Sequence, residues 1–116
     1  MLTLQDSRVD PSAGNNISIR MASQNGFTDI VRLLLQDPRV DPSADNNYAI
    51  KYASANGHVE VVRLLLQNQK VDPSVDRNYP IREASNHGYD KIVKLLCCIA
   101  SHAMQYNSVN NVVVNL

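Results

Sequence analysis

Apolar positions along the chain form a pattern of paired helices that returns three times. In the middle copy, residues 48–55 place Ile50 and Ala53 three positions apart, which predicts a short helix with one apolar face. Residues 59–67 are apolar over most of a helical circumference, so a second helix is expected between neighbouring elements rather than on a surface. Leu64, within this run, is accordingly predicted to be a buried core residue.

The residues between the helices indicate where each helix begins and ends. Asn56-Gly57 is expected to end the first helix, because glycine adopts a positive φ just past a helix terminus. Asp41-Pro42-Ser43 predicts a turn ahead of it, since Pro42 fixes its own φ and disfavours helical geometry at the preceding residue. Each unit therefore consists of a loop, a short helix, a tight glycine turn and a longer antiparallel helix.

The unit recurs every 31 residues. The motif Val-Asp-Pro-Ser stands at residues 9–12, 40–43 and 71–74, and Gly26, Gly57 and Gly88 keep the same spacing. A unit of this length cannot bury a core alone, so its copies must stack in a one-dimensional array. The predicted fold class is all-α, a helix-turn-helix repeat solenoid with about three full repeats and a partial N-terminal one.

The expected organisation follows from this register. Residues 1–8 are interpreted as the tail of a truncated preceding repeat, 9–39 as repeat 1, 40–70 as repeat 2, 71–105 as repeat 3 with an extended last helix, and 106–116 as a poorly ordered C-terminal tail. The tail, rich in Asn and Val, is alternatively a strand that pairs with a partner or aggregates. We interpret the chain as a fragment or short product of a longer array, and expect the first apolar face to be partly open because no polar cap precedes it.

Residues 53–66 (Ala-Ser-Ala-Asn-Gly-His-Val-Glu-Val-Val-Arg-Leu-Leu-Leu) resemble the ankyrin repeat. The other two units match at the same spacing, and the resemblance covers residues 2–100. The period is two residues shorter than the ankyrin period of about 33, so a tighter inter-repeat hairpin is expected. This short form resembles repeats found in proteins of large DNA viruses and some protists.

The opening of the ankyrin unit differs in this chain. The family's Thr-Pro-Leu-His is replaced at residues 17–20, 48–51 and 79–82, where only Pro80 is kept. The hydrogen bonds that this motif makes between ankyrin units therefore need a substitute. Asn16, Asn47 and Asn78 precede the first helices by one residue and are expected to cap them.

Composition narrows the class of function. Eleven basic residues balance eleven acidic ones, and the chain has one Phe and no Trp, so nucleic-acid binding is not expected. No apolar run approaches the roughly 18–20 residues of a membrane span, and no signal peptide opens the chain. We predict no membrane association and a cytoplasmic location, in the host cytoplasm if the source is viral.

No arrangement of residues suited to catalysis or metal binding is evident. The chain has no CxxC motif, and its three His residues fall in different units, so no metal or cofactor is expected. Cys97 and Cys98 are adjacent and are interpreted as reduced core residues at a helix end. Asp10, Asp41 and Asp72 stand at proline turns, where Asp has a structural role, so the protein is not predicted to be an enzyme.

Equivalent residues of stacked units should form columns. Arg20, Lys51 and Arg82 would form a basic stripe along the first helices. One interpretation is a solvated face with internal ion pairs, and the other is a groove for an acidic partner.

The resemblance implies a non-catalytic protein–protein interaction module that presents loop tips and first helices to a protein partner of unknown identity. Tyr48, Tyr52 and Tyr79 are candidate anchors, or else pack between units. The alternative function is a structural segment that associates weakly with itself through uncapped repeat ends. The predicted partner-binding surface comprises Asn15, Asn16, Ser18, Met21, Asn46, Asn47, Ala49, Lys51, Tyr52, Arg77, Asn78, Pro80, Arg82 and Glu83.

Overall fold

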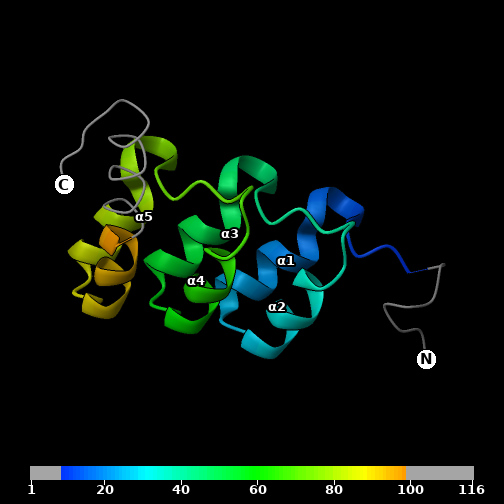
Figure 1. Ribbon diagram of the computed structural model, residues 1–116, viewed down its shortest axis with the longest axis horizontal. Coiled ribbons are helices and arrows are strands. Elements are labelled where there is room, and N and C mark those ends of the chain that lie inside the picture. The colour runs from blue at the N-terminus through cyan, green and yellow to red at the C-terminus, as the bar shows by residue number, and fades with distance from the viewer. Residues whose placement is uncertain (1–8, 99–116) are drawn as a thin grey trace, which may run out of the picture.

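The computed structural model describes residues 9–98, which form helices and no strands. The elements are α1 (Ala13–Asn25), α2 (Thr28–Leu35), α3 (Ala44–Ala55), α4 (Val59–Leu65) and α5 (Val75–Asn86), and residues 90–98 are also helical. Helix pairs line up along the long axis of the molecule (Figure 1). The predicted all-α repeat solenoid is confirmed, whereas the predictions for residues 1–8 and 99–116 lie outside the described residues.

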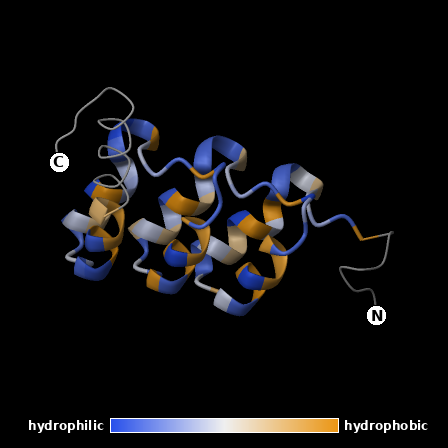
Figure 2. Cartoon of the chain, viewed as in Figure 1, coloured by the Kyte–Doolittle hydropathy of each residue, from blue (hydrophilic) through white to orange (hydrophobic). Residues whose placement is uncertain are grey.

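The core lies between successive repeats rather than inside any one of them. Helix α3 packs between α1 and α5, and α4 packs against α2. Ile19 and Ile50 are fully buried on the first helices, as are Val31 and Val61 on the second helices. Figure 2 shows apolar and polar residues alternating along each helix, with mainly polar residues in the connecting loops. Each repeat thus covers apolar surface of its neighbour, as the array predicts.

The second helices bury only part of the predicted apolar surface. In α4, Val61, Val62 and Leu65 are fully buried. Leu64 packs against this core but is only partly buried, so the prediction that it is a buried residue was wrong. In the helical segment 90–98, Ile92 and Leu96 turn inward, and Cys97 and Cys98 are exposed. The prediction that these cysteines are core residues was therefore also wrong. No helix in residues 9–98 is long and apolar enough to cross a membrane.

Helices α1, α3 and α5 each begin with one turn of left-handed backbone. In α3 this turn comprises Asp45, Asn46 and Asn47, with φ between 56° and 58°, and the right-handed helix follows from Tyr48. The N–H of Asn47 donates to the carbonyl oxygen of Ser43 at 2.9 Å and closes the turn. L-residues disfavour this geometry, and Gly, Asn and Asp tolerate it best. These residue types fill the three turns at 14–16, 45–47 and 76–78, with Arg77 as the exception.

The Asn residues predicted to cap the first helices instead connect neighbouring repeats. The Oδ1 atom of Asn16 accepts a hydrogen bond from the backbone N–H of Asp41 at 2.9 Å, and Asn47 makes the same bond to Asp72. The capping prediction is wrong for these two residues, because the left-handed turn directs their side chains to the next repeat. These two bonds tie each of the first two repeats to the repeat that follows it.

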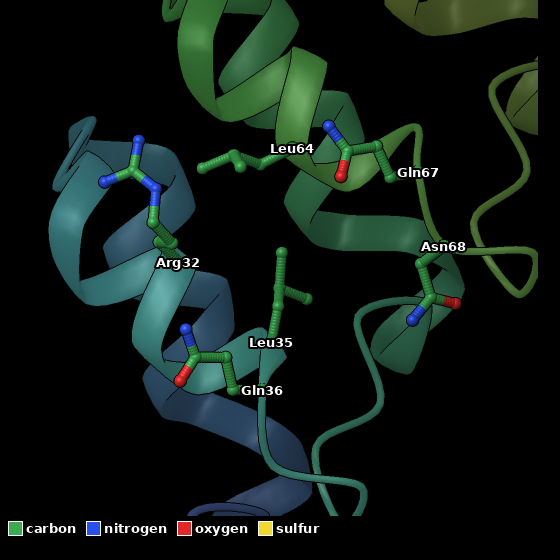
Figure 3. Close-up of a pocket in the computed structure, with 6 residues that line it drawn as sticks. All are labelled: Arg32, Leu35, Gln36, Leu64, Gln67 and Asn68. Atoms are coloured by element: carbon green, nitrogen blue, oxygen red, sulfur yellow. The ribbon is translucent and has the colours of Figure 1, made fainter.

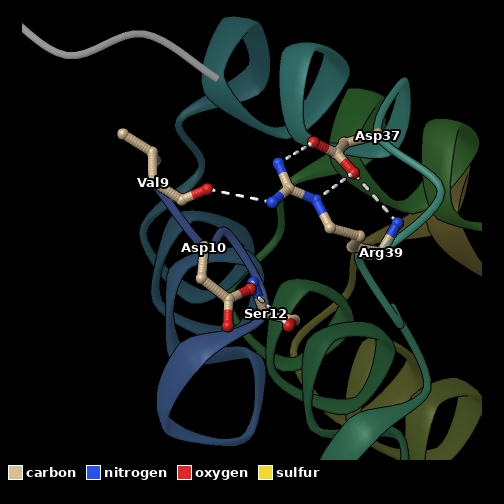
Figure 4. Close-up of polar contacts among 5 residues, drawn as sticks. All are labelled: Val9, Asp10, Ser12, Asp37 and Arg39. Atoms are coloured by element: carbon tan, nitrogen blue, oxygen red, sulfur yellow. Dashed lines mark hydrogen bonds and ion pairs between the residues drawn. The ribbon is translucent and has the colours of Figure 1, made fainter. Parts of the chain in front are cut away.

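A second link joins the loop after α2 to the segment before α1. Figure 4 shows the guanidinium of Arg39 paired with Asp37, with an Nη2–Oδ2 distance of 2.8 Å, while Nη1 donates to the carbonyl oxygen of Val9 at 3.0 Å. Asp10, beside it, accepts bonds from the N–H and hydroxyl of Ser12. The Arg39 contacts therefore tie the two ends of repeat 1 together, whereas the bonds of Asn16 and Asn47 join successive repeats.

Candidate functional site

The basic residues of the first helices form ion pairs with acids of the following repeat. Nη1 of Arg20 lies 3.4 Å from Oδ2 of Asp45, and Nζ of Lys51 lies 2.9 Å from Oδ2 of Asp76. Both acids belong to left-handed turns, 25 positions after the cation. The side chain of Lys51 is only 11% exposed. Arg20 and Lys51 of the predicted basic stripe therefore form internal ion pairs, which favours that interpretation over a groove for an acidic partner at these two positions.

The carboxylate of Asp76 has two partners in repeat 2. Besides Lys51, Nδ2 of Asn46 donates to both oxygens, at 3.1 and 3.2 Å. Hydrogen bonds from Lys51, and then from Asn46, hold the pKa of Asp76 below its usual value. We call positions 46 and 51 the carboxylate clamp of repeat 2, and we use the same name for the equivalent two positions of the other repeats.

Three tyrosines lie beside the clamp and connect the repeats. The ring centroids of Tyr48 and Tyr52 are 4.4 Å apart, and those of Tyr52 and Tyr79 are 6.0 Å apart. Nζ of Lys51 lies 5.7 Å from the centroid of Tyr52 and 6.0 Å from that of Tyr79. The hydroxyl of Tyr48 also donates to Oε1 of Gln24. Burial, and then the charge of Glu83, raises the pKa of Tyr79.

Burial divides the predicted partner-binding residues into three groups. A buried side chain offers no surface to a partner, so four residues are removed from the predicted surface: Ala49 and Pro80 are fully buried, and Asn16 and Lys51 are buried while bonded to the next repeat. The exposed residues are Asn15, Ser18, Asn46, Arg77, Asn78 and Arg82; the partly buried ones are Met21, Asn47, Tyr52 and Glu83.

Several residues of this network were not predicted as site residues, namely Gln24, Asp45 and Asp76. The spacing of 25 between each cation and its acid was present in the sequence as a signal. It becomes informative only once the left-handed turn is known, because that turn brings the acid of one repeat beside the cation of the previous one.

Two hollows on the surface lie on the second helices. The first is a groove with a volume of about 300 Å³. Its lining residues are drawn in Figure 3: Arg32, Leu35, Gln36, Leu64, Gln67 and Asn68. A second groove of about 200 Å³ is lined by Arg63, Leu66, Gln67, Leu95 and Cys98. Its lining is largely that of the first groove shifted by one repeat, so both grooves follow from the stacking of second helices. In residues 9–98 no group of three His, Cys, Asp or Glu side chains is placed to hold a metal ion.

Comparison with protein families decides the identity of the repeat. The family described as ankyrin repeats (3 copies) matches residues 18–110. The chain belongs to the ankyrin repeat family. Ankyrin repeats are in general protein–protein interaction modules, and the family is typically non-catalytic. Comparison with curated proteins and with solved structures gave no match.

Proposed function

We propose that this ankyrin array binds a folded protein partner through the exposed side of its first helices and left-handed turns. The observation that carries the proposal is the column formed by Met21, Tyr52 and Glu83. These equivalent residues of three successive repeats are all partly exposed. They stand on helices whose opposite sides are packed in the core. A preorganised surface loses little conformational entropy on binding, so its contacts yield more affinity.

The proposed surface, which we call the first-helix face, excludes the four buried residues. It comprises Asn15, Ser18, Met21, Asn46, Asn47, Tyr52, Arg77, Asn78, Arg82 and Glu83. Tyr52 is the proposed anchor, because its ring has a large apolar area and a polar end. The exposed thiols of Cys97 and Cys98 favour a reducing compartment, and we place the interaction in the cytoplasm.

The experiment identifies the partner and then tests the face. The immobilised protein captures partners from an extract of cells that express the gene, and the affinity of each purified candidate is measured by calorimetry. The face variant carries Ser18→Glu, Met21→Glu and Glu83→Lys. The matched control carries Gln36→Glu, Glu60→Lys and Gln67→Glu, three exposed positions on or beside the second helices.

The face variant should bind its partner at least about tenfold more weakly, because the altered charge pattern and the lost Met21 contact remove the complementarity of the surface. The control should bind within about twofold of the wild type, since surface changes away from an interface have small effects. Circular dichroism checks that both variants are folded. A partner that binds the face variant with unchanged affinity, or that loses affinity for the control, overturns the proposed face.

A second candidate function is association through the open side of repeat 1. Ile30 is 49% exposed, whereas its equivalents Val61 and Ile92 are fully buried. Ile17, Phe27 and Leu33 share this exposure, and all four large apolar side chains exposed within residues 9–98 belong to repeat 1. Exposed apolar side chains grouped in one repeat are typical of an interaction site, and in the inner repeats the equivalents of these four residues are buried or partly buried.

Sedimentation over a range of concentrations tests this second candidate. Wild-type protein should show a mass that rises with concentration, and Ile30→Glu should abolish the rise because a charge cannot enter an apolar contact without a partner. Arg63→Glu, an exposed change on α4, serves as the control. A wild-type mass that stays monomeric throughout contradicts self-association.

A further inference from the structure

The carboxylate clamp of repeat 3 is built from two arginines. In repeat 2, Asn46 and Lys51 hold the carboxylate that repeat 3 supplies. The equivalent positions of repeat 3 are Arg77 and Arg82, both exposed. The last clamp in the described chain is thus more basic than the one before it.

The guanidinium of Arg82 is held in the same way as that of Arg20. Nε of Arg82 donates to the carbonyl oxygen of Arg77 at 2.9 Å, and Nη2 donates to that of Asp76 at 3.0 Å. Arg20 makes the two equivalent bonds, at 3.0 and 3.1 Å, and its Nη1 reaches the carboxylate of Asp45. The side chain of Arg82 is therefore positioned in advance, with Nη1 equivalent to the nitrogen that Arg20 uses for an acid of the next repeat.

The sequence has no acidic residue 25 positions after Arg82, where the spacing of the two earlier ion pairs would place one. The residue 25 positions after Arg20 is Asp45, and the one 25 positions after Lys51 is Asp76. The corresponding residue after Arg82 is Asn107, which carries no charge. Within residues 9–98 neither Arg77 nor Arg82 forms an ion pair of 4 Å or less. The charge of Arg82 makes a minor contribution to the lowered pKa of Asp76, but that carboxylate is held by Lys51 and Asn46 of repeat 2.

We propose that Arg77 and Arg82 form a binding site for an Asp or Glu side chain of an acidic segment in the protein partner. The proposal rests on the interaction function proposed above and assigns the chemistry of one part of the first-helix face. The carboxylate takes the place that Asp45 and Asp76 fill in the earlier repeats. Two guanidinium groups suit it, because their N–H groups match the geometry of a carboxylate.

Two further observations favour a ligand at this point. Arg77 lies in a left-handed turn, with φ 57°. The other eight residues of the three left-handed turns are all Gly, Asn or Asp. A long cationic side chain at such a position carries a conformational cost that no internal ion pair within residues 9–98 offsets. Arg82 also lies over the ring of Tyr79, at 5.8 Å from the centroid, which keeps its guanidinium plane in place.

The repeat register argues against a second copy of this chain as the occupant. If repeat 1 of one molecule stacked on repeat 3 of another, its residue 14 would face the clamp, as Asp45 and Asp76 do inside the array. That residue is Gly14, which has no side chain to offer. The occupant is therefore an acidic segment of a different protein.

A peptide titration tests the site without knowledge of the partner. Octaglutamate and octaglutamine are titrated into the full chain, and binding is followed by calorimetry and by NMR shifts of backbone amides. The site variant is Arg77→Gln with Arg82→Gln. The matched control is Arg32→Gln with Arg63→Gln, which removes the same charge from two exposed residues on the second helices that pair with Asp29 and Glu60.

Octaglutamate should bind with shifts centred on repeat 3, and the site variant should bind it at least about tenfold more weakly. The control should stay within about twofold, and octaglutamine should not bind. Loss of affinity in the control equal to that in the site variant, or no binding of octaglutamate to the wild type, overturns the site. A phosphoserine peptide that binds far more tightly than octaglutamate replaces the carboxylate assignment with a phosphate one.

The two proposals can fail separately. A partner whose affinity falls with the face variant, together with no binding of octaglutamate, leaves the interaction function standing and removes the carboxylate site. If octaglutamate binds at repeat 3 but the partner binds the face variant as tightly as the wild type, the carboxylate site stands and the proposed first-helix face is removed. Urea unfolding of every variant confirms that a lost affinity is not a lost fold.

Discussion

The imidazole ring of His58 lies against Gly26 of the preceding repeat, where a Cβ atom would come within 2.5 Å of the ring Nδ1. Nε2 of the same ring donates to the carbonyl oxygen of Gln24 at 2.9 Å, so the ring is fixed to the backbone of repeat 1. One repeat later, the ring of Tyr89 approaches Gly57 in the same manner. Gly26 therefore meets two requirements, a left-handed φ of 75° and space for a neighbouring ring.

A comparison of Gly26→Ala with Gly88→Ala separates these two requirements. Gly88 has a φ of 74° and no atom of residues 9–98 within 4 Å of its Cβ position, so its substitution carries only the left-handed cost of about 1–2 kcal/mol. Gly26→Ala should lower the free energy of unfolding by about 1 kcal/mol more, because the added methyl must displace the His58 ring from its hydrogen bond. Urea denaturation measures both. Equal losses would show that the ring moves freely.

The run of leucines in α4 leads to a second prediction. Leu65 is fully buried and Leu64 is partly buried beside the groove of Figure 3. Leu65→Ala should lower the free energy of unfolding by about 2–5 kcal/mol, through lost burial and the cavity left behind. Leu64→Ala should lower it by about 1 kcal/mol, because less apolar area leaves water there. Denaturant titration of the two variants checks this order, and a larger loss for Leu64→Ala would contradict it.

Periodicity and glycine position were enough to predict the helical repeats. The regular spacing of apolar residues, with Gly26, Gly57 and Gly88 after the first helices, predicts antiparallel pairs that stack, and the all-α solenoid follows. Finer burial within a run was not predictable from the pattern. Leu64 and Leu65 are identical in type, and a rotation of about 100° around the helix axis decides which of them enters the core.

The polar links between repeats were the part that the sequence did not reveal. Asn47 precedes a helix and matches a capping residue in type and position. The left-handed turn changes the outcome, because it carries the side chain across to Asp72. The same turn places Asp76 beside Lys51. Contacts between repeats depend on a backbone geometry that single-residue preferences do not specify, so the cations were predicted and their partners were not.

Acid should destabilise the fold through its aspartates. Hydrogen bonds from Arg39, Ser43 and Lys51 lower the folded-state pKa of Asp37, Asp41 and Asp76, respectively. Lowered pKa values contribute stability that is fully present above the unfolded value of about 3.9 and is lost as pH falls through the folded values. The free energy of unfolding should therefore stay level between about pH 5 and 7 and fall below about pH 4.

Asp76→Asn tests the contribution of one of these acids. The variant should be less stable than the wild type at neutral pH, and its stability should fall less between pH 5 and 3, because the amide cannot be protonated in that range. Urea denaturation at each pH gives both quantities. Asp29→Asn is the control, since that side chain is 97% exposed. An acid-dependent loss in Asp76→Asn as large as in the wild type would assign the effect to other groups.

The hydrogen bond from Asp72 to Asn47 predicts different outcomes for two otherwise equivalent substitutions. Asn47→Ala removes the acceptor for the N–H of Asp72, an exposed hydrogen bond whose loss costs about 0.5–1.5 kcal/mol because water can take over the freed donor. Asn78→Ala is the matched control, because Asn78 has the same left-handed backbone, with φ 64°, and no hydrogen bond is described for its side chain within residues 9–98. The difference in free energy of unfolding between the two variants therefore isolates the inter-repeat bond from the backbone cost. The amide of Asp72 should also exchange its hydrogen faster in Asn47→Ala than in the wild type. If the two variants are equally stable and that amide is still protected, the hydrogen bond does not contribute, and the apolar core alone holds repeats 2 and 3 together.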